Sequence, residues 1–504
     1  MVDTAPAVAD APTITSASGK SWGIVCGLEV HCELSTATKL FCSCANEFGA
    51  EPNTNVCPVC LGLPGSLPVL NERAVEYALR VGEAFGFDVP AESIFHRKNY
   101  FYPDMPKNFQ TTQYDEPICL DGSLVVDGAR IGITRAHLEE DTGKSTHLGG
   151  AGGRIHGASI SLVDYNRAGV PLLEIVSEPD IRSAEQAAAY VDELRSTLKA
   201  IGVSDVKMEE GSLRVDANVS VRPAGTSDFG TRCEIKNLNS LKSLRDAIDH
   251  EARRQIELIE AGDTVAQETR LWNENAGHTA SMRSKEEAYD YRYFPEPDLV
   301  PVVPDAALRE RVRASMPELP AARRTRLMDA WGIGEAEART LVDVDGLADY
   351  AEAVQAVAPA SVSGRDVANW ATQDVLGVVN AHAVALHLLD PSALAELLGF
   401  VADGSLSRNQ AKDVLAEMLV ESKRPADIVA ERGLAQVSDT GALESLIDEV
   451  FAANADAVAE WRAGDDKMRK KKRGFLMGEA MKASKGQGNP KLLNELLDTK
   501  LANS

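Results

Sequence analysis

The sequence predicts an α+β protein in which a mixed, largely antiparallel sheet domain is followed by helical domains. Several segments of the first half alternate apolar and polar side chains with the period of two that is typical of a strand. After about Pro304 this alternation stops, and the sequence becomes rich in Ala, Leu and Glu at helical spacing. Strands gathered before helices favour separate sheet and helical layers.

The strand-like segments are residues 23–34, 130–141, 213–222 and 231–237, and the last two are expected to form a hairpin. Two amphipathic helical patterns interrupt the strands. They span residues 183–201 and 240–261.

The chain divides into four predicted segments. Residues 1–20 are rich in Ala, Pro, Ser and Thr and lack a basic head and an apolar core, so we expect a disordered extension and no secretory signal. The sheet domain is predicted over 21–304 and a helical domain over 305–400. A break at Asp403-Gly404 indicates a separate helical tail over 401–504.

The overall charge opposes binding to nucleic acid, whereas its distribution allows it. The 504 residues carry 52 Lys and Arg against 76 Asp and Glu, a net charge of −24. Basic residues nevertheless concentrate at 467–473 (KMRKKKR), although such a run is also typical of a solvated helix face. No apolar stretch is long enough to cross a bilayer, so we expect a cytoplasmic protein.

Four of the eight cysteines form two close pairs, Cys42-x-Cys44 and Cys57-x-x-Cys60. Two such pairs separated by a loop can place four thiolates tetrahedrally around Zn²⁺. The alternative is four free thiols. Because four sulfur ligands leave no open position, a structural zinc is predicted and a catalytic one is not. The other four cysteines stand among apolar neighbours and are expected to be small buried side chains.

The strand at residues 23–34 carries acidic and imidazole groups on one face. Glu29, His31 and Glu33 alternate with apolar residues, so they lie on one side of the strand. A histidine between two carboxylates is a candidate divalent-cation site. The alternative is a solvated strand face.

Other strands repeat this mixture of acids, bases and amides. On the strand at 130–141, His137, Glu139 and Asp141 share a face with Arg135, whereas Glu140 shares the opposite one. Carboxylates for Mg²⁺ and arginines or lysines for phosphate oxygens would suit a cleft that binds both. Further polar residues on the later segments are Asp164, Glu174, Arg214, Asp216, Asn218, Arg232, Glu234 and Lys236.

Common nucleotide and hydrolase motifs are absent from the sequence. Gly143-Lys144-Ser145 resembles the end of a phosphate-binding loop, but Leu138 stands where its first glycine belongs. There is neither a GxGxxG after a strand nor a GxSxG, and no Ser-rich amidase signature. If this protein binds ATP, it does so without a standard phosphate-binding loop. If it uses ammonia, another chain must release that ammonia.

Six long motifs resemble the B subunit family of the tRNA-dependent amidotransferases. They are residues 27–31 (GLEVH), 97–104 (RKNYFYPD), 137–147 (HLEEDTGKSTH), 176–180 (VSEPD), 207–212 (KMEEGS) and 290–298 (DYRYFPEPD). The resemblance spans nearly the whole chain beyond the N-terminal extension. It implies a cradle-shaped catalytic domain, a helical domain and a tRNA-binding tail, in agreement with the division above.

The resemblance also implies an activity and its partners. The family is an amide-forming, glutamine-hydrolysing ligase that uses ATP and Mg²⁺ to phosphorylate the side-chain carboxylate of Glu-tRNA(Gln) or Asp-tRNA(Asn). Ammonia from a glutaminase A subunit, passed through an inter-subunit channel, then gives Gln-tRNA(Gln) or Asn-tRNA(Asn). A C subunit completes a heterotrimer. The helical tail and its basic cluster would meet the tRNA phosphates.

Roles carried over from the resemblance fall on individual residues. The expected magnesium ligands are Glu29, His31 and Glu139, with Glu140 as the substitute for Glu139 if the strand bulges. Further candidates for the catalytic cleft are Asp164, Glu210, Asp216 and Lys236, although Glu210 also suits a solvated turn. Candidates for nucleotide binding are Arg97, Lys98, Tyr100, Arg214 and Arg232, of which the first three also suit the channel or a structural role.

Two other functions stay open at this point. The first is a non-catalytic scaffold that binds tRNA within the same complex, which the polar strands oppose. The second is a stand-alone zinc hydrolase, which requires an open metal position that the four-cysteine spacing does not leave.

Overall fold

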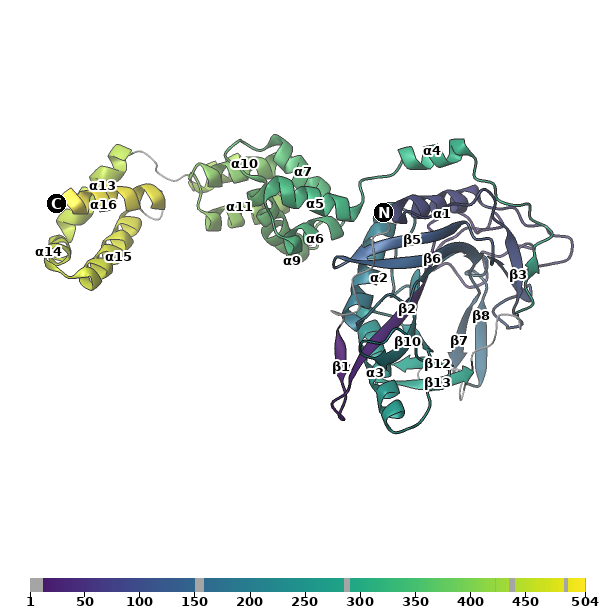
Figure 1. Ribbon diagram of the computed structural model, residues 1–504. Coiled ribbons are helices and arrows are strands. Elements are labelled where there is room, and N and C mark those ends of the chain that lie inside the picture. The colour runs from purple at the N-terminus through teal and green to yellow at the C-terminus, as the bar shows by residue number, and fades with distance from the viewer. Residues whose placement is uncertain are drawn as a thin grey trace. The chain divides into compact units, whose positions relative to one another are not determined.

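The computed structural model describes residues 12–149, 158–284, 291–421, 423–434, 440–484 and 488–503, and it confirms the predicted fold class. A large mixed sheet with three long helices forms the N-terminal part, and helices form the rest (Figure 1). Contacts divide the chain into two compact units, Met1–Leu319 and Pro320–Ser504.

The first unit is built on a 12-stranded sheet in the order β13-β12-β11-β10-β2-β9-β6-β4-β3-β14, with β1 beside β2 and β5 beside β6. The pair β11–β12 is parallel and the other pairs are antiparallel. A separate hairpin pairs β7 with β8. The strands are β1 Thr13–Thr15, β2 Ser21–Glu33, β3 Phe95–Asn99, β4 Phe109–Gln113, β5 Cys119–Val126, β6 Ala129–Glu140, β7 Lys144–Leu148, β8 Ile160–Asp164, β9 Pro171–Ser177, β10 Leu213–Pro223, β11 Cys233–Leu238, β12 Glu268–Asn273, β13 His278–Ser284 and β14 Phe294–Pro295.

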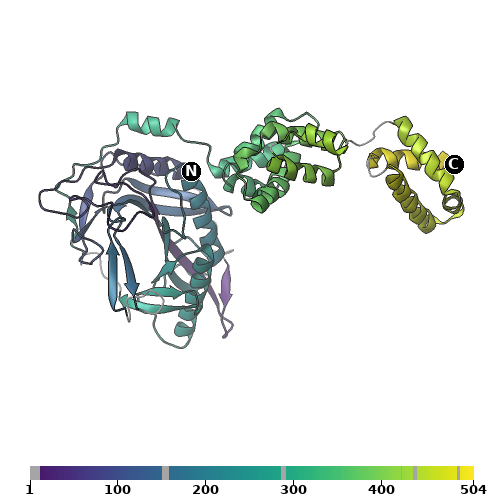
Figure 2. The same ribbon diagram turned by 180° about the vertical axis from the view of Figure 1, so that it is seen from behind.

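Three helices cover the apolar face of this sheet: α1 Glu72–Phe85, α2 Ala184–Ala200 and α3 Leu241–Glu260. The sheet curves, with these helices on its outer side (Figure 2). The hydroxyls of Ser183 and Ser240 accept hydrogen bonds from backbone N–H groups in the first turns of α2 and α3, which fixes where both predicted helices begin. The polar face of the central strands therefore points away from the helices.

The N-terminal extension is more ordered than predicted. Residues 13–15 form β1, which pairs with β2 from Thr13↔Gly23 to Thr15↔Ser21. The side chain of Glu260 accepts hydrogen bonds from Ser16 and Ser18, which anchors the turn after β1. Residues 1–11 lie outside the described residues.

The last helix of the first unit is α4 Ala306–Ala314, which packs on α1. Arg309 of α4 donates hydrogen bonds to the carbonyls of Val89 and Pro90 at 3.0 and 2.7 Å. The first helix after the sheet thus begins at Ala306, and the compact unit extends to Leu319 because of these contacts.

The second unit contains two apolar cores, one built from residues between Leu327 and Ile428 and the other from residues between Leu443 and Leu501. The predicted boundary at 400/401 falls inside α10, whose buried side chains belong to the first of these cores. The helices are α5 Pro320–Trp331, α6 Glu335–Asp343, α7 Leu347–Val357, α8 Gly364–Asn369, a π-helical segment Trp370–Val375, α9 Leu376–His382, a 3-10 turn Leu386–Leu388, α10 Pro391–Ala402, α11 Arg408–Glu421, α12 Pro425–Arg432, α13 Thr440–Ala453, α14 Ala455–Ala463, α15 Asp466–Ala483 and α16 Pro490–Asn503.

Within the described residues, every helix is too short or too polar to span a membrane.

The substitution Leu173→Ala in β9 tests the packing of the sheet on its helices. Leu173 is fully buried, so the truncation is expected to destabilise the first unit by about 2–5 kcal/mol through lost burial and a residual cavity. Hydrogen exchange of β2 and β9 amides in the full chain measures this change. The matched control is Val125→Ala on the exposed side of β5, and equal exchange rates in the two variants would contradict the assigned core.

Candidate active site and candidate zinc centre

Three ionisable side chains stand in one row across the middle of the sheet. In the antiparallel register His31 of β2 lies opposite Glu174 of β9, and Glu174 lies opposite His137 of β6. Residues opposite each other in such a ladder have side chains on the same face. Glu29 and Glu139, each two residues from a member of the row, share that face.

The side chains of this row approach closely enough to share a ligand. The Nε2 atom of His31 lies 3.3 Å from Glu174 Oε2 and 3.9 Å from Glu139 Oε1. The Nε2 atom of His137 lies 3.6 Å from Glu174 Oε2 and 3.9 Å from Glu139 Oε2. Ligand atoms of His31, Glu139 and Glu174 all lie within 4.8 Å of one another, so one metal ion fits between them.

Burial and mutual repulsion perturb the carboxylates of the site. Burial, then the charge of Glu174, raises the pKa of Glu139 to about 7. Burial, then Glu174, Glu234 and Asp216, raises the pKa of Glu29. Burial is the first cause of both raised pKa values and the neighbouring carboxylates are the second, and a bound divalent cation would relieve both.

The two histidines differ in their environment. Burial lowers the pKa of His31, but the hydrogen bond and charge of Glu174 outweigh it and raise that pKa to about 9. Burial lowers the pKa of His137 to about 4, which keeps this imidazole neutral. Arg135 donates to Nδ1 of His137 at 3.4 Å, so the ring proton of His137 stays on Nε2 and that atom cannot bind a metal. His31, whose ring nitrogen lies close to Glu139 and Glu174, is the candidate imidazole ligand, and a bound cation would have to displace its proton.

Lys98 of β3, a candidate for nucleotide binding from the sequence, lies close enough to interact with this site. Its ammonium group is subject to the charges of Glu139 and Glu174 and lies 4.9 Å from the ring centre of Tyr291. Tyr293 stacks on Tyr114 at 4.1 Å beside this lysine. The aromatic rings shield one side of the lysine from solvent.

Two further ion pairs flank the row on β10. Arg214 donates to both carboxylate oxygens of Asp141, at 3.2 and 2.7 Å, and these bonds outweigh burial and lower the pKa of Asp141 to about 2. The Lys236 Nζ lies 2.6 Å from Asp216 Oδ2, and its charge also acts on Glu29. Both ion pairs therefore border the row.

Glu140 and Arg97 lie in a different environment, a pocket of about 200 Å³ next to the cysteines. Glu140 forms an ion pair with Lys107 and accepts a hydrogen bond from the Thr111 amide at 2.8 Å. Arg97 forms two hydrogen bonds with Glu296, both at 2.7 Å. Because Glu140 follows Glu139 on β6 without a bulge between them, it points to the opposite face.

Three other residues that were candidates for the cleft or for nucleotide binding interact with residues near them in the structure. Asp164 ends β8 in the separate hairpin and accepts from the amides of Asn53 and Asn166 at 3.0 Å. Glu210 is exposed in a turn and pairs with Lys207 at 3.0 Å, as expected of a solvated turn. Tyr100 stacks on a neighbouring tyrosine ring at 5.8 Å.

Sequence reasoning gave no role to Glu174 and named His137 only as a neighbour of Glu139. Glu174 is the one charged residue of β9, whose other described side chains are apolar or hydroxyl. Burying a single carboxylate costs free energy unless it has partners. A lone Glu in an otherwise apolar strand was therefore the sequence feature that could have indicated a functional role for Glu174. The sequence alone could not supply its partners, because the order of the strands decides them.

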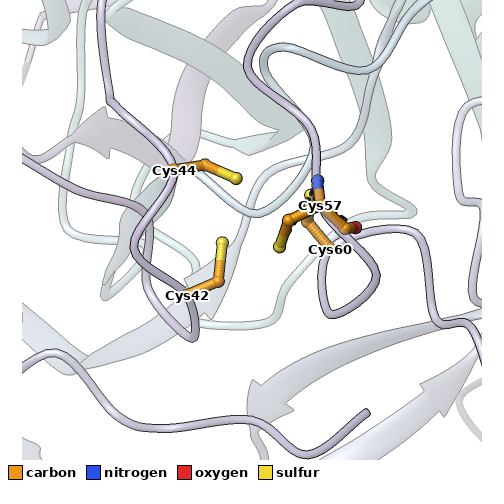
Figure 3. A group of neighbouring side chains, drawn as sticks. All are labelled: Cys42, Cys44, Cys57 and Cys60. Atoms are coloured by element: carbon orange, nitrogen blue, oxygen red, sulfur yellow. Dashed lines mark hydrogen bonds between the residues drawn. The ribbon is translucent and has the colours of Figure 1, made fainter.

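The four cysteines meet as predicted. Cys42 and Cys44 come from one loop and Cys57 and Cys60 from the next, with the two pairs of side chains facing each other (Figure 3). All four sulfur atoms lie within 4.8 Å, and those of Cys57 and Cys60 are 3.9 Å apart. Tetrahedral coordination with Zn–S distances of about 2.3 Å requires sulfur separations of about 3.8 Å. The cluster fits zinc.

Backbone hydrogen bonds shape both cysteine loops. The Lys39 N–H donates to the carbonyl of Cys44 at 3.0 Å, and this turn compensates for the alternation that would point Cys42 and Cys44 apart in a strand. The Cys57 N–H donates to the sulfur of Cys60 at 3.1 Å. The remaining cysteines, Cys26, Cys32, Cys119 and Cys233, are buried as expected.

Comparisons with known proteins identify the family of the chain. Residues 24–310 match the GatB/GatE catalytic domain, and residues 352–501 match the GatB domain. The chain is 50% identical to the B subunit of the aspartyl/glutamyl-tRNA(Asn/Gln) amidotransferase of Myxococcus xanthus, over 95% of this chain and 98% of that protein. It is 51% identical to the corresponding proteins of Moorella thermoacetica and Geotalea uraniireducens, over 95% of this chain and 99% of each.

The cysteine cluster predicts a measurable metal content. We expect the purified chain to contain about one equivalent of zinc, measured by atomic emission, because four convergent thiols bind this ion tightly. The double substitution C57A/C60A should remove it, whereas Cys233→Ala should not. Zinc-free wild-type protein, or unchanged zinc in C57A/C60A, would contradict the assignment.

Proposed function

Because the chain belongs to the GatB/GatE family, as a B subunit of the aspartyl/glutamyl-tRNA(Asn/Gln) amidotransferases, we propose that the row His31–Glu174–His137 is the centre of an ATP-dependent amidation. The substrate is glutamate or aspartate esterified to tRNA, and the product is the corresponding amide. The supporting observation is the convergence of ionisable groups from three central strands on one buried site.

The proposed reaction has two steps, phosphoryl transfer and amidation. One oxygen of the substrate carboxylate attacks the γ-phosphorus of ATP, the bond from that phosphorus to its bridging oxygen breaks, and ADP leaves. The nitrogen of ammonia then attacks the carboxyl carbon, the carbon–oxygen bond to the phosphate breaks, and phosphate leaves. A proton passes from the nitrogen to a base, and the amide remains.

The donor set fits Mg²⁺, with His31, Glu139 and Glu174 as its proposed ligands. When bound there, the ion would neutralise charge on the phosphate oxygens during phosphoryl transfer. Glu29, expected from the sequence to be a ligand, lies two residues before His31 on β2. It accepts a hydrogen bond from Asn218 at 2.8 Å. We assign Glu29 as the base that accepts the proton from the attacking ammonia.

The cations around the row have separate tasks in this proposal. Lys98 lies beside Glu139 and Glu174, where it orients the substrate carboxylate and offsets the charge of the site. Arg214 holds Asp141, and Lys236 holds Asp216, so the two ion pairs form the border of the row. Neither cation is then free to bind nucleotide, although Arg214 was expected from the sequence to have that role.

The proposal also includes the partners that the family implies. A glutaminase A subunit supplies ammonia through a channel, and a C subunit completes the complex. The basic cluster 467–473 on α15 contacts tRNA. In that cluster Lys472 pairs with Glu460 and Arg473 with Asp498, whereas Lys470 and Lys471 have no ion pair with any of the described residues.

Amide formation tests the proposed centre directly. The full chain is purified with its A and C subunits and assayed on Glu-tRNA with ATP, Mg²⁺ and ammonium, which bypasses the glutaminase. Glu174→Gln, His31→Ala and Glu29→Ala are each expected to lower kcat at least about 100-fold, the effect of losing a ligand or an acid–base group.

The control for these substitutions is Glu185→Gln, a solvent-exposed acid in the first turn of α2. It should leave amide formation unchanged. A folded wild-type complex that forms no amide on Glu-tRNA or Asp-tRNA, or a Glu174→Gln variant as active as the control, would favour the scaffold function instead.

The tail is tested by its salt dependence. The double substitution K470A/K471A should weaken tRNA binding and make the slope of log affinity against log salt less negative by about 1 to 2, because fewer counterions are released. Titrations at several salt concentrations measure this. The control K20A/K242A removes equal charge from the first unit, and an identical slope in both variants would contradict tRNA contact by this cluster.

A further inference from the structure

The two cysteine loops are fastened to a segment of the chain that leads into the central sheet. This joining segment, residues 163–170, contains the end of β8 and the turn that enters β9 at Pro171. Residues 51–55, which lie between the two cysteine pairs, form hydrogen bonds with its first half. Residues 39–40, just before the first pair, bond to it as well. Because β9 carries Glu174, the joining segment links the cysteine loops to the row.

Asn53 makes three hydrogen bonds to the joining segment although it lies at the surface. Its Nδ2 donates to the carbonyl of Val163 at 3.1 Å, its Oδ1 accepts from the Tyr165 amide at 2.8 Å, and its own amide donates to Asp164 Oδ1 at 3.0 Å. The φ angle of Asn53 is 60°, a left-handed conformation that costs free energy for any residue other than glycine. These hydrogen bonds hold the residue in that conformation.

A second asparagine bonds in the opposite direction. Asn166 of the joining segment donates through Nδ2 to the carbonyl of Glu51 and accepts through Oδ1 from the Asn55 amide, both at 2.8 Å. We call Asn53 and Asn166 the asparagine clasp. Because each of its two side chains bonds the backbone of the other segment, the clasp fixes the cysteine loop and the joining segment relative to each other.

A buried lysine forms another connection. Lys39 is fully buried, and its Nζ donates to the carbonyl of Tyr165 at 3.1 Å. An ammonium group without solvent needs a compensating charge, and a zinc ion with four thiolate ligands is negatively charged. Gly169, whose φ is +85°, passes so close that an added Cβ would lie 3.6 Å from Lys39 Cδ and 3.7 Å from Cys60 Cβ. The cysteine cluster, the lysine and the joining segment therefore pack together.

The joining segment also bonds to the end of β6. The Gly169 N–H donates to the carbonyl of Asp141 at 2.9 Å, and the Asp141 N–H donates to the carbonyl of Val170 at 2.8 Å. These bonds extend the antiparallel ladder of β6 and β9 beyond its last pair. Asp141 comes just after Glu139 of β6, and Val170 comes just before the strand that carries Glu174. The joining segment thus contributes to the register that places these two carboxylates together.

We propose that the zinc centre is a positioning element for the row. The metal fixes the cysteine loops, the clasp and Lys39 hold the joining segment against them, and that segment holds Glu139 and Glu174 at the separation their chemistry needs. A small displacement of a reacting group lowers the rate strongly, so a contact at this distance from the row can control turnover. The catalytic consequence rests on the proposed function, whereas the coupling of the cysteine loops to the row does not.

Two variants test the coupling with and without the metal. Asn53→Gly removes the side-chain hydrogen bonds, and because glycine adopts the left-handed backbone freely, it adds no strain. It leaves all four cysteines in place and should keep about one equivalent of zinc. C57A/C60A removes the metal. The matched control is Asp127→Gly, at an exposed residue with a φ of 50° in the turn between β5 and β6.

Hydrogen exchange in the full chain, followed by mass spectrometry, is the readout that needs no turnover. In both variants the peptides that contain Asp141 and Gly169 are expected to exchange at least about tenfold faster than in Asp127→Gly, because local opening becomes easier. Peptides of β10 should keep the wild-type rates, which shows that the first unit is folded. If C57A/C60A does not fold, Asn53→Gly decides alone. Unchanged exchange at Asp141 and Gly169 would overturn the coupling.

Kinetics of the complex with its A and C subunits, with ammonium as the nitrogen donor, test the catalytic consequence. Asn53→Gly should lower kcat about tenfold or more and leave KM for ATP and for Glu-tRNA near the wild-type values, because the row is displaced and substrate binding is not. Faster exchange together with the kcat of Asp127→Gly would overturn the positioning role. A wild-type complex that forms no amide contradicts the proposed function alone, since hydrogen exchange still decides whether the cysteine loops hold the row.

Discussion

The antiparallel register of β2, β9 and β6 is the constraint on which the rest of the first unit depends. It brings His31, Glu174 and His137, far apart in the sequence, into one row. A slip of one residue on any of these strands would turn its polar side chains into the apolar core. The helices α2 and α3 oppose such a slip, because they pack against the apolar residues that alternate with the polar ones.

Concentrating so much charge in a buried site is unfavourable, and the neighbouring strands offset part of that cost. Arg214 pairs with Asp141, Lys236 with Asp216, and Lys98 lies near Glu139 and Glu174. Burial first, and the neighbouring carboxylates second, raise the pKa values of Glu29 and Glu139, so part of that cost is not offset. A divalent cation bound there would relieve this repulsion, so the electrostatic cost of the site is consistent with its proposed function.

The period of two predicted the main strands to within about two residues, and the helical spacing of apolar residues predicted α2 and α3. It also separated Glu139 from Glu140, which lie on opposite faces of β6. The period could not reveal which strands are neighbours. Glu174 was therefore given no role, although its position as the only charge on β9 was visible. Asp164 and Glu210 were grouped with the cleft although their partners are local. The expected reaction came from the resemblance to a family, because the alternation of apolar and polar residues indicates strands but not an activity.

The most direct test of the central claim follows an oxygen atom. Glu-tRNA labelled with ¹⁸O in the side-chain carboxylate is incubated with the complete complex, ATP, Mg²⁺ and ammonium, and the released phosphate is analysed by mass spectrometry. The proposed chemistry predicts one ¹⁸O in each phosphate released per amide formed, and loss of this transfer in Glu174→Gln. Amide formation with unlabelled phosphate, or undiminished transfer in Glu174→Gln, would contradict the role assigned to the row.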